Sequence, residues 1–208
     1  MAKRIITLIR HGKVNGPAAL YGHTDIALSI AGANDLTRNI KQIHQHTPIT
    51  HILSSPLARC AKPAQQLSTE LGLPLDIIED LKEMHFGEWD GIPFDAFDEQ
   101  QWQALNRFWE MPATIKAPEG ESLQEFALRI IDAWEQTISK SASEHQLIIC
   151  HGGVIRILIA HILDLDWRNA ALFKQLHIDY ASHTRIEIAD HPAAIPIIKY
   201  ISSTTLAL

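Results

Sequence analysis

One pattern occurs three times in this chain and restricts the fold more than any other feature: a short apolar run, a polar cluster and the start of a helix. Runs rich in β-branched residues are typical of buried strands. Strands that alternate with helices predict a layered α/β fold built on a mostly parallel sheet. The three segments are residues 5–12 (IITLIRHG), 52–59 (ILSSPLAR) and 147–153 (LIICHGG).

The rest of the chain supplies further elements to this sheet. Ser122 and Glu125 have the spacing of a capping box ahead of an apolar helix. Only a short stretch that includes Pro192 separates the last two strand patterns, so we expect an antiparallel hairpin and a mixed sheet. Strand patterns occur at roughly 4–9, 51–55, 75–78, 147–150, 184–188 and 195–201, and helical periodicity at roughly 30–45, 57–71, 100–111, 122–140, 152–163 and 168–174.

These elements predict a three-layer α/β sandwich, in which a mostly parallel mixed sheet is flanked by helices. At 208 residues and 46% hydrophobic composition, the chain suits a single domain over residues 1–208. Residues 86–109 hold seven of the 14 aromatic side chains. We therefore expect a small helical cap insertion at about 86–117, with a core of its own and an apolar wall that faces a substrate.

Composition excludes several classes of function. The net charge of −6 argues against non-specific binding of nucleic acid or of an anionic membrane surface. No apolar run approaches the roughly 18–20 residues of a membrane span, and the one after Met1 is too short for a signal peptide. The expected protein is cytoplasmic, a monomer or homodimer, with a small molecule as its partner.

Metal binding is also not expected. The two cysteines, Cys60 and Cys150, give neither a disulfide framework nor a metal-ligand spacing. His44, His46 and His51 resemble a metal cluster only superficially, because no carboxylate ligand accompanies them in the sequence.

The polar clusters predict a site for a tetrahedral dianion. If the strands are parallel, their carboxyl ends place His11, Arg59 and His151 at one edge of the sheet, where ligands bind in open α/β sheets. Arg10 precedes His11 directly. Helices that begin near residues 56 and 152 add free backbone N–H groups and partial positive charge. Guanidinium groups, imidazoles and helix ends together suit the capture of a phosphate.

Six motifs follow one another along nearly the whole chain: residues 8–12 (LIRHG), 21–25 (YGHTD) with Leu28-Ser29, 54–60 (SSPLARC), 83–91 (EMHFGEWDG), 118–122 (PEGES) and 151–153 (HGG). In this order the set resembles the histidine phosphatase superfamily, which has the phosphoglycerate-mutase-like fold. The resemblance implies an enzyme that moves a phosphoryl group through a phosphohistidine intermediate, without a metal or another cofactor.

The resemblance also assigns roles to residues. It implies that His11 is the nucleophile and that Glu83 donates a proton to the leaving oxygen. A neutral histidine can attack if one ring N–H is held by an acceptor, and a carboxyl beside a phosphate dianion keeps a proton more easily because like charges repel. The expected catalytic residues are His11, Glu83, His151, Arg10 and Arg59, and the expected substrate-binding residues are Asn15, Thr24 and Gly152.

The expected substrate is a phosphomonoester with a weakly charged alcohol portion. Arg107 and Lys116 are the only Lys or Arg residues in 83–117, where mutases of this family carry a longer basic segment, so hydrolysis is favoured. Residues 10–29 and 83–91 look most like bacterial α-ribazole phosphatases, which implies α-ribazole 5′-phosphate, or the cobalamin 5′-phosphate precursor, as substrate in cobalamin synthesis. The alternatives are a phosphoglycerate mutase, a broad-specificity sugar phosphatase and a non-catalytic phospho-ligand binder.

Overall fold

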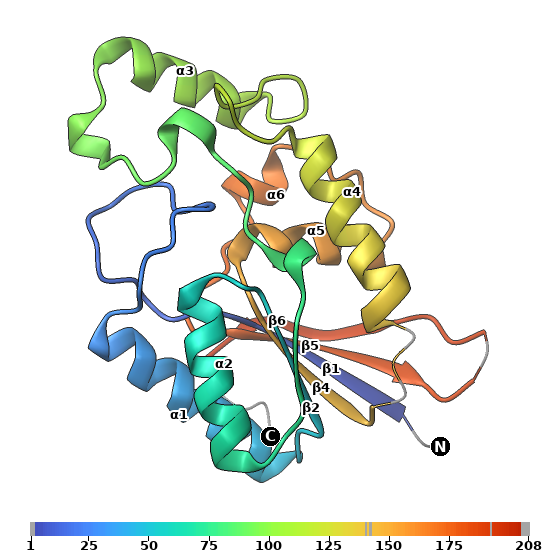
Figure 1. Ribbon diagram of the computed structural model, residues 1–208. Coiled ribbons are helices and arrows are strands. Elements are labelled where there is room, and N and C mark those ends of the chain that lie inside the picture. Colours follow the sequence, from blue (N-terminus) through green and yellow to red (C-terminus); the bar gives the residue numbers. More distant parts are fainter. Residues whose placement is uncertain (1–2, 140, 142, 192, 205–208) are drawn as a thin grey trace.

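The fold is built on one six-stranded sheet, shown in Figure 1. The computed structural model describes residues 3–139, 141, 143–191 and 193–204. The strand order is β3-β2-β4-β1-β5-β6. The strands are β1 (Lys3–Arg10), β2 (His51–Ser54), β3 (Leu75–Ile77), β4 (His145–Cys150), β5 (His183–Ala189) and β6 (Ile197–Ser203).

The sheet is mixed, as the sequence predicts. β1, β2, β3 and β4 are parallel to one another, whereas β5 pairs antiparallel with β1 and β6 antiparallel with β5. The predicted hairpin is therefore present, although Pro192 in its connection lies outside the described residues. In β1, Arg10 is paired with Cys150 of β4, so His11 and His151 leave adjacent strands at the same edge of the sheet.

Helices cover both faces of the sheet, which confirms the predicted α/β layers. Alternate residues of β4 face opposite ways: Ile149 packs with α1 (Ile30–His46) and α2 (Ala58–Leu71), and Ile148 with α4 (Leu123–Ala133) and α5 (Gly152–Ile162). Among the described residues, no helix is both long and apolar enough to cross a bilayer.

Some predicted boundaries were wrong. Strand β4 begins at His145 rather than 147 because His145 and Gln146, although polar, are buried. The helix predicted at 122–140 becomes a π-helical turn from Trp134 to Ile138, and residue 140 lies outside the described residues. The helix predicted at 168–174 is reduced to α6 (Ala171–Lys174), because the side chains of Asp166 and Asn169 bond nearby backbone N–H groups and compete with a helix.

The cap segment lies beyond the carboxyl ends of the parallel strands (Figure 1). After the turn η1 (Glu79–Leu81) it contains the turns η2 (Gly87–Trp89) and η3 (Phe94–Ala96), followed by α3 (Glu99–Glu110). Its buried aromatic residues, such as Trp89 and Phe108, belong to the same apolar cluster as Leu8 of the sheet. The cap therefore shares the central core instead of forming a separate one.

Candidate active site

The three polar clusters meet at the carboxyl ends of β1, β2 and β4. The rings of His11 and His151 lie 5.2 Å apart between centroids. Arg59, in the first turn of α2, donates from Nε to Nδ1 of His151 at 3.3 Å. The structure thus brings together the residues that the sequence pattern places at one sheet edge.

His11 is held in one orientation and one protonation state. Its Nδ1 lies 2.8 Å from the carbonyl oxygen of Gly12. Because a carbonyl oxygen only accepts hydrogen bonds, Nδ1 carries the proton and Nε2 keeps a free lone pair. Burial, followed by the charges of Arg59 and Arg10, holds the pKa of His11 well below its ordinary value. The ring is therefore neutral at physiological pH, and its Nε2 lone pair is available.

His151 and Arg59 are more deeply buried than His11. Nδ1 of His151 accepts from Arg59, so its Nε2 carries the proton and donates to Oγ of Ser55 at 2.8 Å. Burial is the main reason that the pKa of His151 is lowered well below the ordinary value, with the charge of Arg59 second. Both histidines are thus neutral, and the positive charge of the site resides on the arginines.

Arg59 also fixes the loop at 21–25. Its guanidinium donates to the backbone oxygens of Tyr21 (2.9 Å), Gly22 (2.7 Å) and Thr24 (2.9 Å). Together with the bond to His151, these contacts use four of its five N–H groups. Arg59 thus connects the loop 21–25 to His151. One N–H of its Nη1 remains available to a ligand.

Arg10 presents a donor to the start of α5. Nη1 donates to the oxygen of Ile178 at 2.6 Å, and the guanidinium lies 3.8 Å from the ring centroid of Tyr180. Its Nε is buried and has no hydrogen-bond partner in the described part of the chain. A Cβ on Gly152 would lie 3.5 Å from this atom. A buried guanidinium N–H without a partner is costly, and an anion bound here would supply one.

A third arginine, Arg156, lies close to this point. Its Nη1 would be 3.0 Å from a Cβ on Gly152, and its Nε donates to Leu176 at 2.9 Å. Burial lowers the pKa of Arg156, whereas the charge of Glu83 acts in the opposite direction. Two guanidinium groups therefore flank Gly152, the first residue of α5, whose helix dipole adds further positive potential.

Glu83 reaches the same helix end from the other side. Its Oε2 accepts from the backbone N–H of Gly153 at 3.0 Å, and Oε1 from that of Met84 at 3.1 Å. A Cβ on Gly153 would overlap Oε1. The carboxyl group can approach the helix this closely because residue 153 has no side chain.

Thr24 and Asn15 differ in their relation to the site. The backbone N–H of Thr24 donates to Asp90 at 3.0 Å, and its carbonyl accepts from Arg59. Asn15 lies on the exposed loop that follows Gly12, and its backbone N–H donates to Ala27. The loop 21–25 is thus connected to the site through Arg59, whereas Asn15 is exposed and is not among the buried groups.

The two cysteines and the histidine group 44–51 show no sign of a catalytic or metal-binding role. Burial raises the pKa of both Cys60 and Cys150, which makes their thiols poor nucleophiles. The sequence-based expectation that no carboxylate lies near His51 was wrong, because its Nε2 is 2.9 Å from Asp76 Oδ2. Even so, within residues 3–204, apart from the undescribed positions, no group of three or more His, Cys, Asp or Glu could hold a metal ion.

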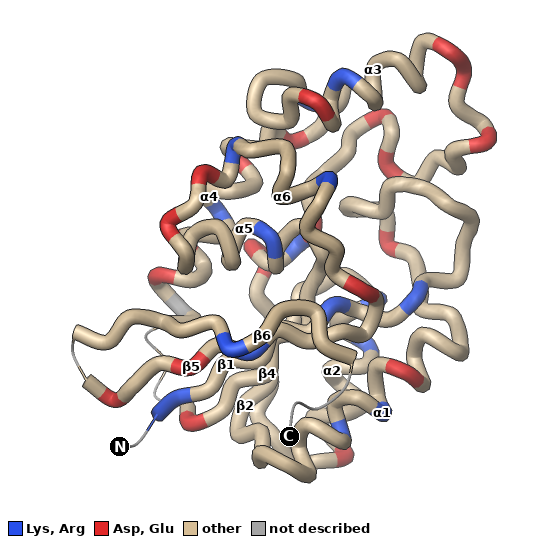
Figure 2. The backbone as a smooth tube through the Cα atoms, turned by 180° about the vertical axis from the view of Figure 1, so that it is seen from behind, with Lys and Arg blue, Asp and Glu red and all other residues tan. Residues whose placement is uncertain are grey.

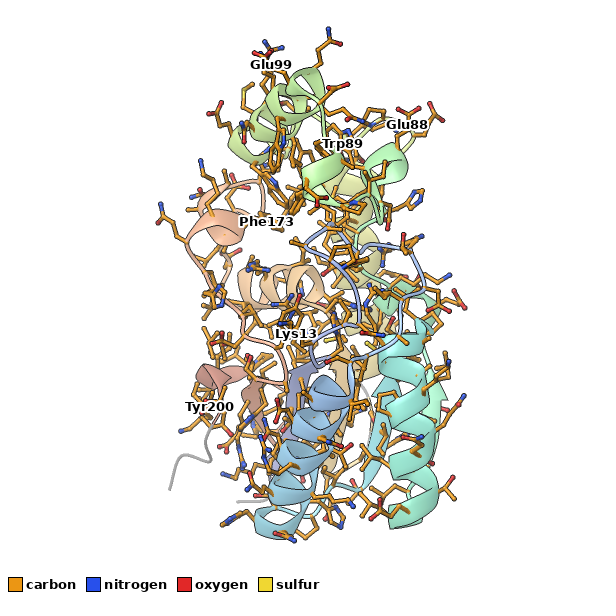
Figure 3. All side chains as sticks on the ribbon, turned by 90° about the vertical axis from the view of Figure 1, so that its left-hand side faces the viewer. Lys13, Glu88, Trp89, Glu99, Phe173 and Tyr200 are labelled. Carbon is orange, nitrogen blue, oxygen red and sulfur yellow. The ribbon has the colours of Figure 1, made fainter. Side chains whose placement is uncertain are left out.

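A pocket leads from Glu83 into the cap. The cavity has a volume of about 70 Å³, and its polar end is formed by Glu83, Gly153 and Arg156. Figure 3 shows Phe173 on the side of α6 that faces the cap. The apolar walls are Met84, Phe86, Phe108, Trp109, Pro112, Leu123, Phe126 and Phe173.

Sequence reasoning missed Arg156, Tyr180 and Asp90. Arg156 follows Gly152 by four residues, and this helical spacing places both on one face, so the signal was present. Tyr180 precedes β5 on an irregular segment, and no sequence pattern indicates that it stacks on Arg10. Asp90 is part of the motif at 83–91, but three of its four backbone partners lie 66 to 68 positions away in the chain.

Known proteins are similar to this chain in sequence or in fold. A "Probable phosphoglycerate mutase GpmB" from Yersinia pestis is 26% identical over 191 residues, 90% of this chain and 86% of its own. The structure of Bacillus stearothermophilus YhfR has a TM-score of 0.83 at 23% identity and covers 96% of both chains. That of a putative alpha-ribazole-5′-P phosphatase from Escherichia coli has a TM-score of 0.82 at 20% identity and covers 99% of this chain and 98% of its own.

The family model of the histidine phosphatase superfamily (branch 1) matches residues 6–198. This range contains every residue of the site described above, from Arg10 and His11 to Tyr180. The chain therefore belongs to the histidine phosphatase superfamily, branch 1.

Proposed function

We propose that this protein is a phosphomonoesterase that works through a phosphohistidine at His11. The observation that carries the proposal is the bond from Nδ1 of His11 to Gly12, which leaves the Nε2 lone pair free in a site lined by guanidinium groups. A neutral imidazole fixed in this way is an effective nucleophile toward phosphorus. The negative charge that spreads over the oxygens of the transferred phosphoryl group is stabilised by Arg10, Arg59 and His151.

In the first step, Nε2 of His11 attacks phosphorus and the ester P–O bond breaks. The proton of the Glu83 carboxyl passes to the leaving oxygen, so the product departs as an alcohol and not as an alkoxide. His11 then carries the phosphoryl group on Nε2, and Glu83 is ionised. The contact between Glu83 and Gly153 supports this role, because it holds the carboxyl beside the helix end to which Arg10 also points.

In the second step, water attacks the phosphohistidine. Glu83 takes a proton from the water, the P–N bond breaks and its electron pair returns to Nε2. Inorganic phosphate is released, and both Glu83 and His11 regain their starting protonation states. With the attacking water included, the chain's own side chains balance these two steps.

The pocket in the cap supports a substrate with an apolar, flat alcohol portion. Five of its walls are aromatic rings, and such surfaces favour stacking. Figure 2 shows acidic residues around α3, and the cap segment contains only Arg107 and Lys116 as cations. These features favour α-ribazole 5′-phosphate, or the cobalamin 5′-phosphate precursor, over a highly anionic bisphosphate.

One observation favours a second candidate, a phosphoglycerate mutase. Arg156 stands at the polar end of the pocket beside Glu83, where its guanidinium could hold the carboxylate of a phosphoglycerate. The Yersinia pestis relative is described as a probable mutase. A broad-specificity sugar phosphatase would use the same position to bind sugar hydroxyl groups.

A substrate panel separates these candidates. Initial rates would be compared for α-ribazole 5′-phosphate, 3-phosphoglycerate, fructose 2,6-bisphosphate and simple sugar phosphates, with phosphate release and isotope transfer between phosphoglycerates as the two readouts. We expect phosphate release, with the highest kcat/KM on α-ribazole 5′-phosphate. Transfer between phosphoglycerates without net release would contradict the proposal, and equal kcat/KM values across the panel would favour the broad-specificity enzyme.

A further inference from the structure

Glu83 lies on a segment without regular secondary structure, residues 82–86, between η1 and η2. A carboxyl group on such a segment keeps its position only if other groups hold the backbone on both sides of it. The carboxyl group of Glu83 has little room to move. Its Oε2 accepts from the N–H of Gly153, and its Oε1 occupies the space that a Cβ on residue 153 would take. The groups that hold residues 80–85 are therefore relevant to the chemistry.

Arg129 of α4 holds the N-terminal side of this segment. Its Nη1 donates to the carbonyl oxygens of Asp80 (2.5 Å) and Lys82 (2.8 Å), and its Nη2 to that of Glu83 itself (3.0 Å). One side chain thus binds three carbonyl groups within four residues. The contacts span 46 to 49 positions in the sequence and are made by a single guanidinium.

Glu121 completes the arrangement and holds the C-terminal side. Its Oε1 and Oε2 accept from Nε and Nη2 of Arg129 at 2.7 and 2.9 Å, in a bidentate pair. Oε2 also accepts from the backbone N–H of His85 at 3.2 Å, and the backbone N–H of Glu121 donates to the oxygen of His85 at 2.9 Å. The pair therefore contacts the backbone before Glu83, at Glu83 and after it.

We propose that Arg129 and Glu121 are positioning residues, which act on the reaction by fixing the backbone that carries Glu83. The inference rests on the proposed role of Glu83 as proton donor. All five N–H groups of Arg129 have an acceptor in this arrangement, and both side chains are mostly buried, with 20% and 13% exposed. A lysine at 129 would keep the charge, but its three N–H groups cannot reproduce the planar five-donor pattern.

The alternative is a purely structural role, in which the pair only attaches α4 to the segment 80–85. The two roles predict different kinetics. If the pair positions Glu83, its disruption harms esters whose leaving group needs a proton and spares those whose leaving group does not. If the role is structural, stability falls and the rates for both kinds of ester fall together.

The test compares Arg129→Lys, Glu121→Gln and Glu83→Gln with the unchanged enzyme. The rate of phosphoenzyme formation is measured in the burst phase with an alkyl phosphate and with nitrophenyl phosphate, and Tm is recorded for each variant. We expect Arg129→Lys to slow the alkyl phosphate by about 10²-fold, the usual effect of a displacement of about 1 Å, and the nitrophenyl ester far less. Arg38→Lys serves as the control, because Arg38 forms an exposed pair with Asp35.

A double variant decides whether the effect passes through Glu83. In the Glu83→Gln background, Arg129→Lys should cause no further loss on the alkyl phosphate, because the group that it positions can no longer donate. The inference is wrong if Arg129→Lys slows both esters equally or slows neither. It is also wrong if the losses of Arg129→Lys and Glu83→Gln add in the double variant. None of these results would change the role of Glu83. If Arg129→Lys does not fold, Glu121→Gln is read in the same way. If Glu83→Gln itself affects both esters equally, the proposed proton donor is wrong and this inference falls with it.

Discussion

At the scale of single residues, the site depends on close approaches that only particular side chains allow. Nδ1 of His11 donates to the carbonyl oxygen of Gly12, and the carboxyl group of Glu83 accepts from the backbone N–H of Gly153. The second contact requires a glycine, because a Cβ on residue 153 would overlap Oε1 of Glu83. The reactivity proposed for Glu83 therefore depends on a residue that carries no functional group.

Gly153→Ala tests this dependence. The added Cβ would overlap Oε1 of Glu83, so the carboxyl must move away from the start of α5. We expect kcat on an alkyl phosphate to fall about 10- to 100-fold, in line with a displacement of the reacting groups by about 1 Å. Steady-state kinetics and Tm measure the two effects separately.

Gly72→Ala is the matched control for that substitution. Gly72 ends α2 with φ of +65°, and no other group lies within 4 Å of a Cβ placed there. Alanine in this left-handed conformation costs about 1 kcal/mol of stability, but the position is remote from the site. An unchanged kcat in Gly153→Ala, or an equal loss in Gly72→Ala, would contradict the assigned contact.

At the scale of elements, the carboxylate of Asp90 organises the loop that follows Tyr21. It accepts from the backbone N–H groups of Gly22 (3.1 Å), His23 (2.7 Å), Thr24 (3.0 Å) and Phe86 (3.3 Å). Burial alone would raise the pKa of Asp90, but the hydrogen bonds from Thr24, His23 and Phe86 outweigh it, and the pKa lies below its ordinary value. The carboxylate thus joins this loop to the cap segment.

Asp90→Asn should weaken the whole loop. An amide has a single acceptor oxygen, and its NH₂ group would face backbone N–H groups that need an acceptor. We expect a loss of about 1–3 kcal/mol in the free energy of unfolding, and a lower kcat because Arg59 depends on carbonyl groups of this loop. Urea unfolding and initial rates measure both, with the exposed Asp95→Asn as control. Equal stability and activity in the two variants would contradict the account.

How much the sequence can predict also differs between elements. The strands, the capping box at Ser122 and the meeting of His11 with His151 follow from local patterns and from the rule that parallel strands end at one edge. The networks around Asp90 and Arg129 could not be predicted, because they join residues 46 to 68 positions apart through tertiary contacts. Strand β4 begins earlier than its apolar run because burial of His145 depends on Thr7 of the neighbouring strand.

At the scale of the whole molecule, buried neutral histidines couple stability to pH. Burial lowers the pKa of His145 to about 4, and burial also lowers the pKa values of His11, His151 and His183. In the unfolded chain each imidazole takes a proton below about pH 6.5, while in the folded chain it does so only at a lower pH. The unfolded state then binds more protons, so stability falls as the pH drops below about 6.5.

We therefore expect the free energy of unfolding to decrease steadily between pH 6.5 and 4, with His145 alone contributing about 3 kcal/mol of the loss. Urea unfolding at pH 7.5, 6.0 and 5.0 measures the slope. His145→Asn should reduce the slope, whatever its effect at pH 7.5. A stability that does not change from pH 7.5 to 5.0, or a slope that this variant leaves unaltered, would contradict the assignment of neutral buried histidines.

The most direct test of the central claim is to trap the phosphoenzyme. A substrate labelled in its phosphoryl group is mixed with the enzyme, the reaction is quenched in alkali, and the protein-bound label is followed before and after acid treatment. We expect the unchanged enzyme and the control variant His46→Ala, at an exposed position, to carry label that acid treatment removes. A folded His11→Ala variant should carry no label. Label that remains on His11→Ala, or that resists acid on the unchanged enzyme, would place the nucleophile elsewhere.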